Sequence, residues 1–356
     1  MWIATRYADV REVLGDATRF SNRMAFRPPT DPRSEEEREK ARAGQLLALD
    51  PPEHTRLRRL LRPEFTVRRM QRLEPRIVEI VDEHLDAMAA AGSPADLVPT
   101  FALPIPSLVI CELLGVPYAD RAEFQDRTAR QLDLSISLEE RMELGRAGRT
   151  YMESLVARAK REPGEDMLGM LVREHADEIT DDELVGIGNL LLIAGHETTS
   201  NMLGLGTLAL LRHPEQLAIV RDEQAAAAPA VEELLRWLTI VHSGVVRTAT
   251  ADVELAGHTI PAGDLVVCSL PTANRDPELI RDPETLDVTR GAAGHVAFGH
   301  GVHHCLGAPL ARMEMRIAFP ALLRRFPGLA LDVPFEEVPF RAFHFIYGLQ
   351  ALPVRW

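Results

Sequence analysis

Apolar side chains recur with helical spacing along most of the chain, and the longest such stretch lies in its middle. It starts at Thr180, with Glu183 three residues later. This is a capping box, in which the two side chains satisfy backbone N–H groups of the first turn. It ends before Pro214, because proline cannot continue a helix. The pattern predicts a helix of about 30 residues, roughly 45–50 Å long at 1.5 Å per residue.

Other helices are predicted on both sides of this central one. Helical spacing covers residues 52–92, with a break near Pro63, and continues to about Lys160 between clusters of proline and glycine. It returns over residues 230–238 and 308–326. Helix is therefore the main structure that the sequence predicts.

Short strands are predicted at the N-terminus and between the last helices. Residues 2–5 are typical of a strand, and a helix through Val10 and Leu14 follows. No linker or internal repeat divides the chain, so we expect a mainly α fold with small β-sheets in a single domain, residues 1–356. Turn residues separate four further strands: Val245–Thr248, Val253–Leu255, Thr259–Ile260 and Leu265–Ser269.

Residues 22–49 show no clear period and contain a charged run, Glu35–Lys40. Two interpretations stay open: a flexible loop over a pocket, or an ordinary surface loop.

Charge and cysteine content limit the classes of function. The net charge is -13, with 53 acids against 40 bases, the opposite of what a nucleic-acid-binding protein shows. Three cysteines are too few for a disulfide framework and favour a reducing cytoplasm. The most apolar stretch, residues 184–211, carries several polar side chains in its middle, which argues against a membrane span. We expect a cytoplasmic monomer.

One cysteine, Cys305, closes a glycine-rich loop that starts at Phe298 and leads into a helix. Glycines let the backbone turn tightly and approach a flat ligand. The N–H groups of the next helix stabilise a thiolate, and a thiolate bound to haem iron favours O–O cleavage. Three other interpretations stay open: a nucleophile beside histidine, a structural cysteine, or a zinc site formed with His295, His300, His303 and His304. Cys111 and Cys268 lie in apolar contexts and are expected to be core thiols.

A second unusual stretch, Ala194–Thr199, lies midway along the central helix. Gly195 costs about 1 kcal/mol there relative to alanine. Glu197 and the two threonines after it need polar partners or a cavity. A kinked, hydrogen-bonded core helix is the alternative. Glu233 and Arg236 share one face of the next helix.

The loop from Phe298 to Gly307 resembles the haem-binding loop of the cytochrome P450 family, and the order of the other motifs agrees with soluble bacterial members. The resemblance implies that Cys305 is the axial iron ligand. It implies that Glu197 and Thr198 deliver protons to bound oxygen, for which Gly195 leaves room. It implies that Glu233, Arg236 and Arg290 form a structural network. The other residues implied to contact the cofactor are Ala194, Gly195, Phe298, Gly299 and Gly307, with His54, Arg58, Arg247 and His303 on its propionates.

The resemblance implies a haem b monooxygenase that inserts one atom of O2 into an apolar small molecule, such as a polyketide or macrolide, terpene or steroid. Electrons are expected from ferredoxin and ferredoxin reductase, because the chain has neither a nucleotide-binding fingerprint nor a four-cysteine iron–sulfur motif. Leu191, Ala194 and Val241 are expected to line the substrate pocket. A haem-binding sensor without turnover and a cysteine-dependent hydrolase remain alternatives.

Two further expectations concern the N-terminus and an arginine-rich stretch. Family members have a few tens of residues before the segment that matches residues 2–10. We expect either that the start of the chain is misassigned or that the first strand and helix of the fold are missing. Residues 52–76 hold eight arginines and three acids. We expect Arg59 and Arg69 in this stretch to guide an acidic ferredoxin.

Overall fold

The computed structural model describes residues 1–23 and 34–356. The irregular stretch predicted over residues 22–49 therefore falls partly outside the described residues. Its described part contains helix α2 (Glu35–Arg42) and a short 3-10 turn, Leu46–Ala48.

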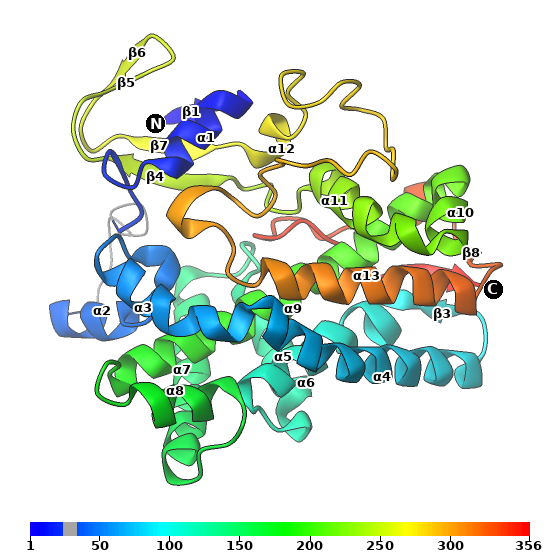
Figure 1. The fold of residues 1–356 in the computed structure, drawn as a ribbon, viewed down its shortest axis with the longest axis horizontal. Coiled ribbons are helices and arrows are strands. Elements are labelled where there is room, and N and C mark those ends of the chain that lie inside the picture. Colours follow the sequence, from blue (N-terminus) through cyan, green and yellow to red (C-terminus); the bar gives the residue numbers. More distant parts are fainter. Residues whose placement is uncertain (24–33) are drawn as a thin grey trace.

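The central helix is α9 (Asp181–Arg212), and the other helices surround it (Figure 1). Its N-terminus has the predicted capping box between Thr180 and Glu183. Helices α5 (Pro104–Leu114), α7 (Leu138–Arg161) and α13 (Ala308–Arg325) pack directly against α9. The remaining helices are α1 (Tyr7–Gly15), α3 (Glu53–Leu61), α4 (Val67–Ala91), α6 (Arg121–Gln131), α8 (Met167–His175), α10 (Pro214–Asp222), α11 (Ala227–Leu238) and α12 (Leu270–Ala273).

Short turns of other helix types join these elements. The break expected near Pro63 is the 3-10 turn Arg62–Phe65, which separates α3 from α4. A π-helical turn, Val98–Ala102, precedes α5. Further 3-10 turns are Tyr118–Asp120, Gln224–Ala226, Gly301–His303 and Phe335–Glu337.

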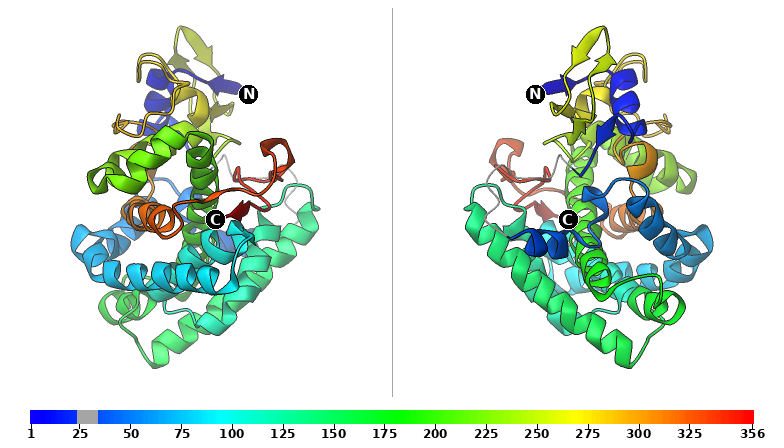
Figure 2. Two further views of the ribbon diagram at one scale, coloured as in Figure 1. Left: turned by 90° about the vertical axis from the view of Figure 1, so that its right-hand side faces the viewer. Right: turned by 90° about the vertical axis from the view of Figure 1, so that its left-hand side faces the viewer.

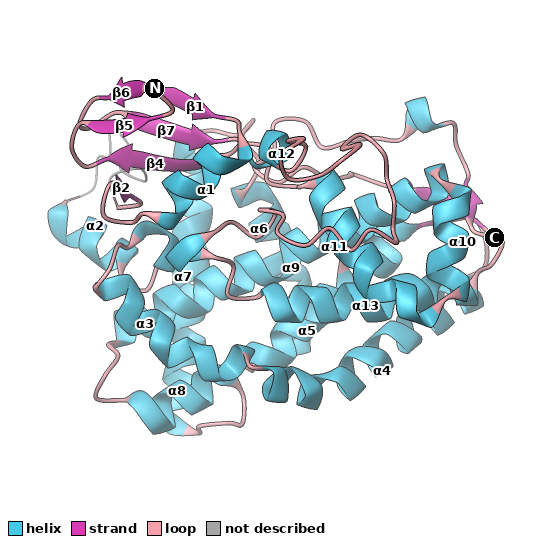
Figure 3. Ribbon diagram, turned by 45° about the horizontal axis from the view of Figure 1, so that its top comes forward, coloured by secondary structure: helices cyan, strands magenta, loops and turns pink. Residues whose placement is uncertain are grey.

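The strands lie at two ends of the helical body (Figure 3). The larger sheet has the order β1-β7-β4-β2, with β1 parallel to β7 and the other pairs antiparallel. A three-stranded sheet has the order β3-β9-β8, and β5 pairs with β6. The mainly helical fold with small sheets is confirmed. Strand bounds are β1 (Trp2–Ala4), β2 (Phe20–Ser21), β3 (Ala95–Asp96), β4 (Val245–Ala249), β5 (Val253–Leu255), β6 (His258–Ile260), β7 (Leu265–Cys268), β8 (Ala330–Leu331) and β9 (Pro353–Arg355).

Helix α9 is buried over most of its length, yet one strip in its middle is accessible. Ala194 is exposed, and Leu191, Gly195 and Thr198 are partly exposed. These residues are three or four positions apart, so they share one face of the helix. Among the described residues, no helix combines the length and apolar character of a membrane span.

Candidate active site

The loop that ends at Cys305 is folded back on itself and pressed against α1. The Cys305 N–H donates to the Phe298 carbonyl at 2.9 Å. Gly301 has φ of +72°, and a Cβ there would lie 2.5 Å from the Leu14 carbonyl oxygen. Only glycine combines that backbone angle with so close an approach. The loop therefore fixes where Cys305 stands, one turn before α13.

The Cys305 side chain is accessible, unlike the buried side chains of Cys111 and Cys268. Protein atoms still crowd around its sulfur, and this burial raises the pKa of the thiol. The backbone N–H of Gly307 and the charge of Arg58 act in the opposite direction. Burial raises the pKa of each of the other two thiols to about 12, which confirms them as core thiols. Cys305 is the one sulfur with both access and groups that favour a thiolate.

Four basic side chains expected at the propionates gather near this loop. The His54 ring is 1% exposed, and its centroid lies 4.1 Å from that of His303. Burial lowers the pKa of His54 to about 4 and that of His303 to about 3, and the charge of Arg58 acts on both in the same direction. Arg247 is 4% exposed, and its charge also lowers the pKa of His303.

These basic groups have few partners among the described residues. There, neither ring nitrogen of His54 has a hydrogen-bond partner, and Nε2 of His303 has none. Arg58 donates to the carbonyl of His304 at 2.5 Å, and Arg247 to that of Val246 at 2.9 Å. Buried polar atoms are seldom left without a partner. A ligand with carboxylates would supply the missing acceptors.

On α9, the two residues expected to move protons have different surroundings. Thr198 is partly exposed and donates from Oγ1 to the Ala194 carbonyl at 2.8 Å. Glu197 is 1% exposed, and its Oε2 accepts from Arg341 at 3.0 Å. Thr199 is buried. Glu197 and Thr198 are thus neighbours along the helix, one ion-paired in the interior and the other at the accessible strip.

Gly195 has a packing role that the sequence did not indicate. A Cβ at this position would lie 2.6 Å from Cδ1 of Ile110 on α5. The missing side chain therefore lets α5 and α9 approach each other closely. That Gly195 also leaves room for dioxygen stays a prediction.

Arg341 was missed by the sequence reasoning. It stands 144 residues after Glu197, in an irregular segment with no motif around it. Only the folded chain brings the two together, so no local pattern could have revealed the pair.

The expected structural network on α11 is present and lies in the core. Glu233 and Arg236 are both fully buried, and they form a two-bond pair with both distances 2.8 Å. Arg236 also donates to the carbonyls of Asn274 and Pro283. Arg290 lies 4.0 Å from Glu233. The network ties α11 to the long loop that leads to Cys305.

The zinc interpretation gains no support from the structure. Within residues 1–23 and 34–356, no group of three or more His, Cys, Asp or Glu side chains is arranged to hold a metal ion. His295 instead contacts Glu232 at 3.1 Å, and Glu232 accepts two bonds from Arg312 at 2.6 and 2.8 Å.

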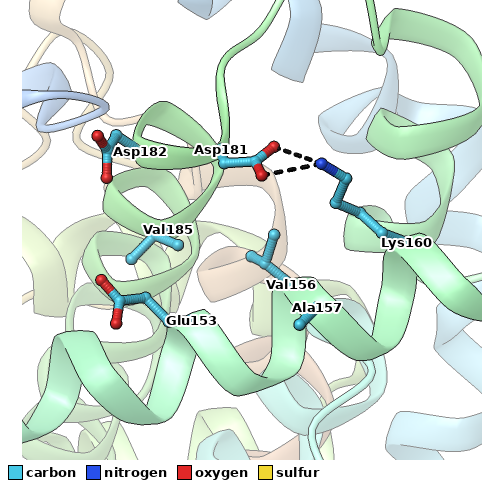
Figure 4. A pocket seen from close by; sticks show the side chains of 7 residues that line it. All are labelled: Glu153, Val156, Ala157, Lys160, Asp181, Asp182 and Val185. Atoms are coloured by element: carbon cyan, nitrogen blue, oxygen red, sulfur yellow. Dashed lines mark hydrogen bonds and ion pairs between the residues drawn. The ribbon is translucent and has the colours of Figure 1, made fainter.

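A surface cleft between α7 and α9 is also a poor candidate for a site (Figure 4). Its carboxylates are already neutralised, since Lys160 pairs with Asp181 at 2.8 Å and Arg149 pairs with Asp182. The candidate site therefore comprises the Cys305 loop and the α3 residues beside it, and the accessible strip of α9 is assigned to it by the expected role of Thr198.

Comparison with known proteins decides the family. The family model described as Cytochrome P450 matches residues 153–334. Cytochrome P450 FAS1 of Rhodococcoides fascians is 52% identical over 358 residues, which cover 100% of this chain and 90% of that protein. The chain belongs to the cytochrome P450 family. Pentalenic acid synthase of Streptomyces avermitilis is another P450 relative, 47% identical over 100% of this chain and 88% of its own length.

Solved P450 structures agree with this assignment. The crystal structure of CYP105P1 in complex with filipin I superposes with a TM-score of 0.93 at 42% identity, covering 100% of this chain and 89% of that one. The protein is thus an oxidoreductase of the P450 monooxygenase class, and membership of the family implies a haem cofactor. The accessible Cys305 thiol and the unpartnered basic atoms of His54 and His303 fit such a group.

Proposed function

We propose that this P450 inserts one oxygen atom from O2 into an unactivated C–H bond, or across a C=C bond, of an apolar secondary metabolite. The single observation that carries the proposal is that the Cys305 thiol and a group of buried basic side chains lie close together. The accessible thiol of Cys305 lies just before a helix N-terminus and near the charge of Arg58. The buried rings of His54 and His303 beside it have nitrogens without a partner among the described residues. A flat ligand with a metal centre and two carboxylates satisfies both requirements.

The cofactor proposed is haem b, held by Cys305 and by basic contacts from His54, Arg58, Arg247 and His303. When bound, haem supplies the iron at which oxygen is activated. The protein supplies the rest of the chemistry. Burial raises the pKa of the Cys305 thiol, and the N–H groups of Gly307 and Ala308 act against burial and favour the thiolate. Phe298, Gly299 and Gly307 shape the loop that faces the cofactor.

On the opposite side, the accessible strip of α9 is proposed to face the cofactor and the substrate. Ala194, Leu191 and Val241 present apolar side chains that fit an apolar ligand. Thr198 holds a hydroxyl at the strip, and Glu197 next to it is the acid that resupplies its proton from the interior. A sensor without turnover would have no use for this acid–alcohol pair.

The substrate class is supported by the relatives' names. Pentalenic acid synthase and the vitamin D3 dihydroxylase of Streptomyces griseolus are both named for apolar small molecules. We place the substrate of this chain among polyketides or macrolides, terpenes and steroids. The sparse, unpaired cysteines support a reducing cytoplasm as its location.

Electrons are proposed to come from an acidic ferredoxin and its reductase. Docking at Arg59 and Arg69 stays a prediction, and the ion pairs of the folded chain add Arg62 as a further candidate. Arg59 pairs with Glu178 and Arg69 with Glu64, each at 2.8 Å, so their charges are already compensated. Arg62 is exposed and forms no ion pair among the described residues. Burial lowers the pKa of Arg58, and the Arg62 charge adds to that effect, so Arg62 lies near the Cys305 side of the site.

The test is a screen of apolar and polar metabolites against the purified protein for a shift of the Soret band, followed by turnover with 18O2. The proposal expects a band shift with members of one of these classes, and a product that gains one labelled oxygen atom. A product that carries no label, or hits confined to polar compounds, would contradict it.

A further inference from the structure

The segment that carries Arg341 is a narrow hairpin-like loop, residues 340–349, whose two ends are joined by backbone contacts. Phe340 pairs with Leu349 in an antiparallel bridge, and the Arg341 N–H donates to the Gly348 carbonyl at 2.9 Å. In Figure 2 this red C-terminal segment lies beside the green helix α9. We call it the 340–349 hairpin.

The tip of the 340–349 hairpin is bonded to the connection between α6 and α7. The Leu134 N–H donates to the Phe343 carbonyl at 2.7 Å, and the Phe345 N–H donates to the Leu132 carbonyl at 3.0 Å. Both sides of the contact are exposed apolar residues, because Phe343 is 78% exposed and Leu134 is 45% exposed. A movement of this connection is therefore transmitted directly to the hairpin.

The stem of the hairpin rests on the turn of α9 that contains Glu197. A Cβ at Gly348 would lie 1.7 Å from Oδ1 of Asn201, so the absence of a side chain at Gly348 lets its backbone pack directly on the Asn201 side chain. Asn201 in turn donates to the Glu197 carbonyl at 2.7 Å. Arg341 reaches the Glu197 carboxylate itself. The hairpin also contacts α9 at Gly204, through Leu349, but its one ion pair with α9 among the described residues is the bond of Arg341 to Glu197.

Arg341 sets how the Glu197 carboxylate is oriented. Within the described chain it is the one arginine or lysine paired with Glu197, whose second oxygen, Oε1, has no hydrogen-bond partner. His196 lies 3.9 Å away, but burial lowers its pKa and keeps it neutral. A carboxylate this deeply buried is strongly disfavoured without a paired charge. Loss of Arg341 would leave Glu197 uncompensated and free to turn.

We propose that Arg341 is a positioning residue for Glu197, and that the 340–349 hairpin couples the α6–α7 connection to proton delivery on α9. When the connection is seated on the hairpin, Arg341 holds Glu197 in place; when the connection lifts, that hold is released. This inference rests on the proposed monooxygenase function.

The chemical consequence concerns how oxygen is reduced. Release of hydrogen peroxide takes two electrons and two protons per O2 and keeps the O–O bond. Reduction to two waters takes four electrons and four protons and breaks it. The electrons come from reduced ferredoxin in both cases. A poorly positioned Glu197 supplies protons too slowly for the second route, so peroxide accumulates.

The first experiment measures the fraction of consumed O2 that the haem-loaded enzyme releases as peroxide, with NADH, ferredoxin and ferredoxin reductase and no added substrate. Arg341→Gln should raise this fraction to the level of Glu197→Gln, and Arg341→Lys should restore it in part. The double variant should equal Glu197→Gln alone. Arg355→Gln is the matched control, since Arg355 lies in the same C-terminal segment but pairs with exposed Asp332.

The second experiment uses hydrogen exchange and does not depend on turnover. Leu134→Pro removes the N–H that binds the Phe343 carbonyl. It should increase exchange at the Arg341 amide. Leu138→Pro is the control, because Leu138 is similarly exposed (48%) and is the first residue of α7, where proline is tolerated.

A peroxide fraction in Arg341→Gln that is no higher than in the wild type would overturn the inference. Equal protection of the Arg341 amide from hydrogen exchange in Leu134→Pro and Leu138→Pro would also overturn it. Additive effects of Arg341→Gln and Glu197→Gln would also refute the positioning role. Failure of the proposed function looks different. In that case the wild-type protein itself would lack the spectrum of a thiolate-bound haem, whatever the variants do.

Discussion

Single residues in this protein are informative when they are buried without a partner. His54 and His303 both have ring nitrogens with no acceptor or donor in reach, and both were recognised from sequence because the motifs around them are local. Arg341 could not be recognised, because its importance comes from Glu197, 144 residues away. Sequence therefore predicts residues that belong to contiguous motifs, and misses those that the fold alone assembles.

Thr198 provides the sharpest test among single residues. Its hydroxyl lies on the accessible strip of α9, so Thr198→Ala should consume reductant and release peroxide while little product forms. Substrate affinity should change little. The measurement is product and peroxide formed per NADH, with a ligand found by the Soret screen.

Thr199→Ala is the control for this variant, because Thr199 is buried and lies off the strip. Its coupling of electrons to product should stay near that of the wild type. If Thr198→Ala formed product as efficiently as the wild type, the hydroxyl would have no role in proton delivery.

At the scale of elements, helix ends were predicted from the sequence, whereas the close contact between α9 and α5 was not. The sequence predicted α9, its capping box and the break after α3 correctly, because caps and prolines act locally. It did not predict that Gly195 is needed for contact with α5, since helix–helix distances depend on the partner's side chain.

A side chain at Gly301 in the Cys305 loop should lower both the stability of the protein and its retention of haem. In Gly301→Ala, a side chain must occupy a left-handed conformation and approach the Leu14 carbonyl. The expected cost is about 1–3 kcal/mol of unfolding free energy, with weaker haem retention. Gly328→Ala should be harmless, as no atom lies within 4 Å of its Cβ position. Equal melting temperatures and haem contents for the two variants would contradict this.

The link between α11 and α13 should be sensitive to acid. Burial alone would raise the pKa of Glu232, but hydrogen bonds from Arg312 and His295 outweigh it and lower the pKa to about 2. Because the ordinary value is 4.5, the stabilisation is complete above pH 4.5 and is lost as the pH falls toward 2.

Unfolding free energies of the wild type and of Glu232→Gln, measured by denaturant at several pH values, test this. Their difference should be constant between pH 5 and 7, by the pKa values given above, and should shrink at lower pH. A difference that grew on acidification would show that Glu232 is not held ionised by its partners.

At the scale of the whole molecule, positive charge occurs locally in a protein whose net charge is negative. The protein has a net charge of -13, yet Arg62, whose charge acts on Arg58 beside Cys305, forms no ion pair among the described residues. The arginine-rich stretch 52–76 stays the predicted docking region. The sequence could not reveal that Arg59 pairs with Glu178 and Arg69 with Glu64, because these ion pairs come from the folded chain.

Arg62→Glu should therefore slow reduction by an acidic ferredoxin, since it reverses an unpaired charge at the docking face. Stopped-flow reduction of the enzyme is the measurement. Added salt should slow the wild type more than the variant, because the Debye length falls from about 10 Å at 0.1 M salt to about 3 Å at 1 M. Arg59→Glu should have a smaller effect. Equal rates for all three proteins at every salt concentration would place the donor elsewhere.

The central claim is that Cys305 ligates haem iron as a thiolate, and the absorption spectrum of the reduced carbon monoxide complex tests it most directly. The wild-type protein should show the strongly red-shifted Soret band of a thiolate-bound haem. Cys305→His should lose that band even where haem is retained, while Cys268→Ala, which changes a buried core thiol, should keep it. A red-shifted band that survives in Cys305→His would contradict the assignment.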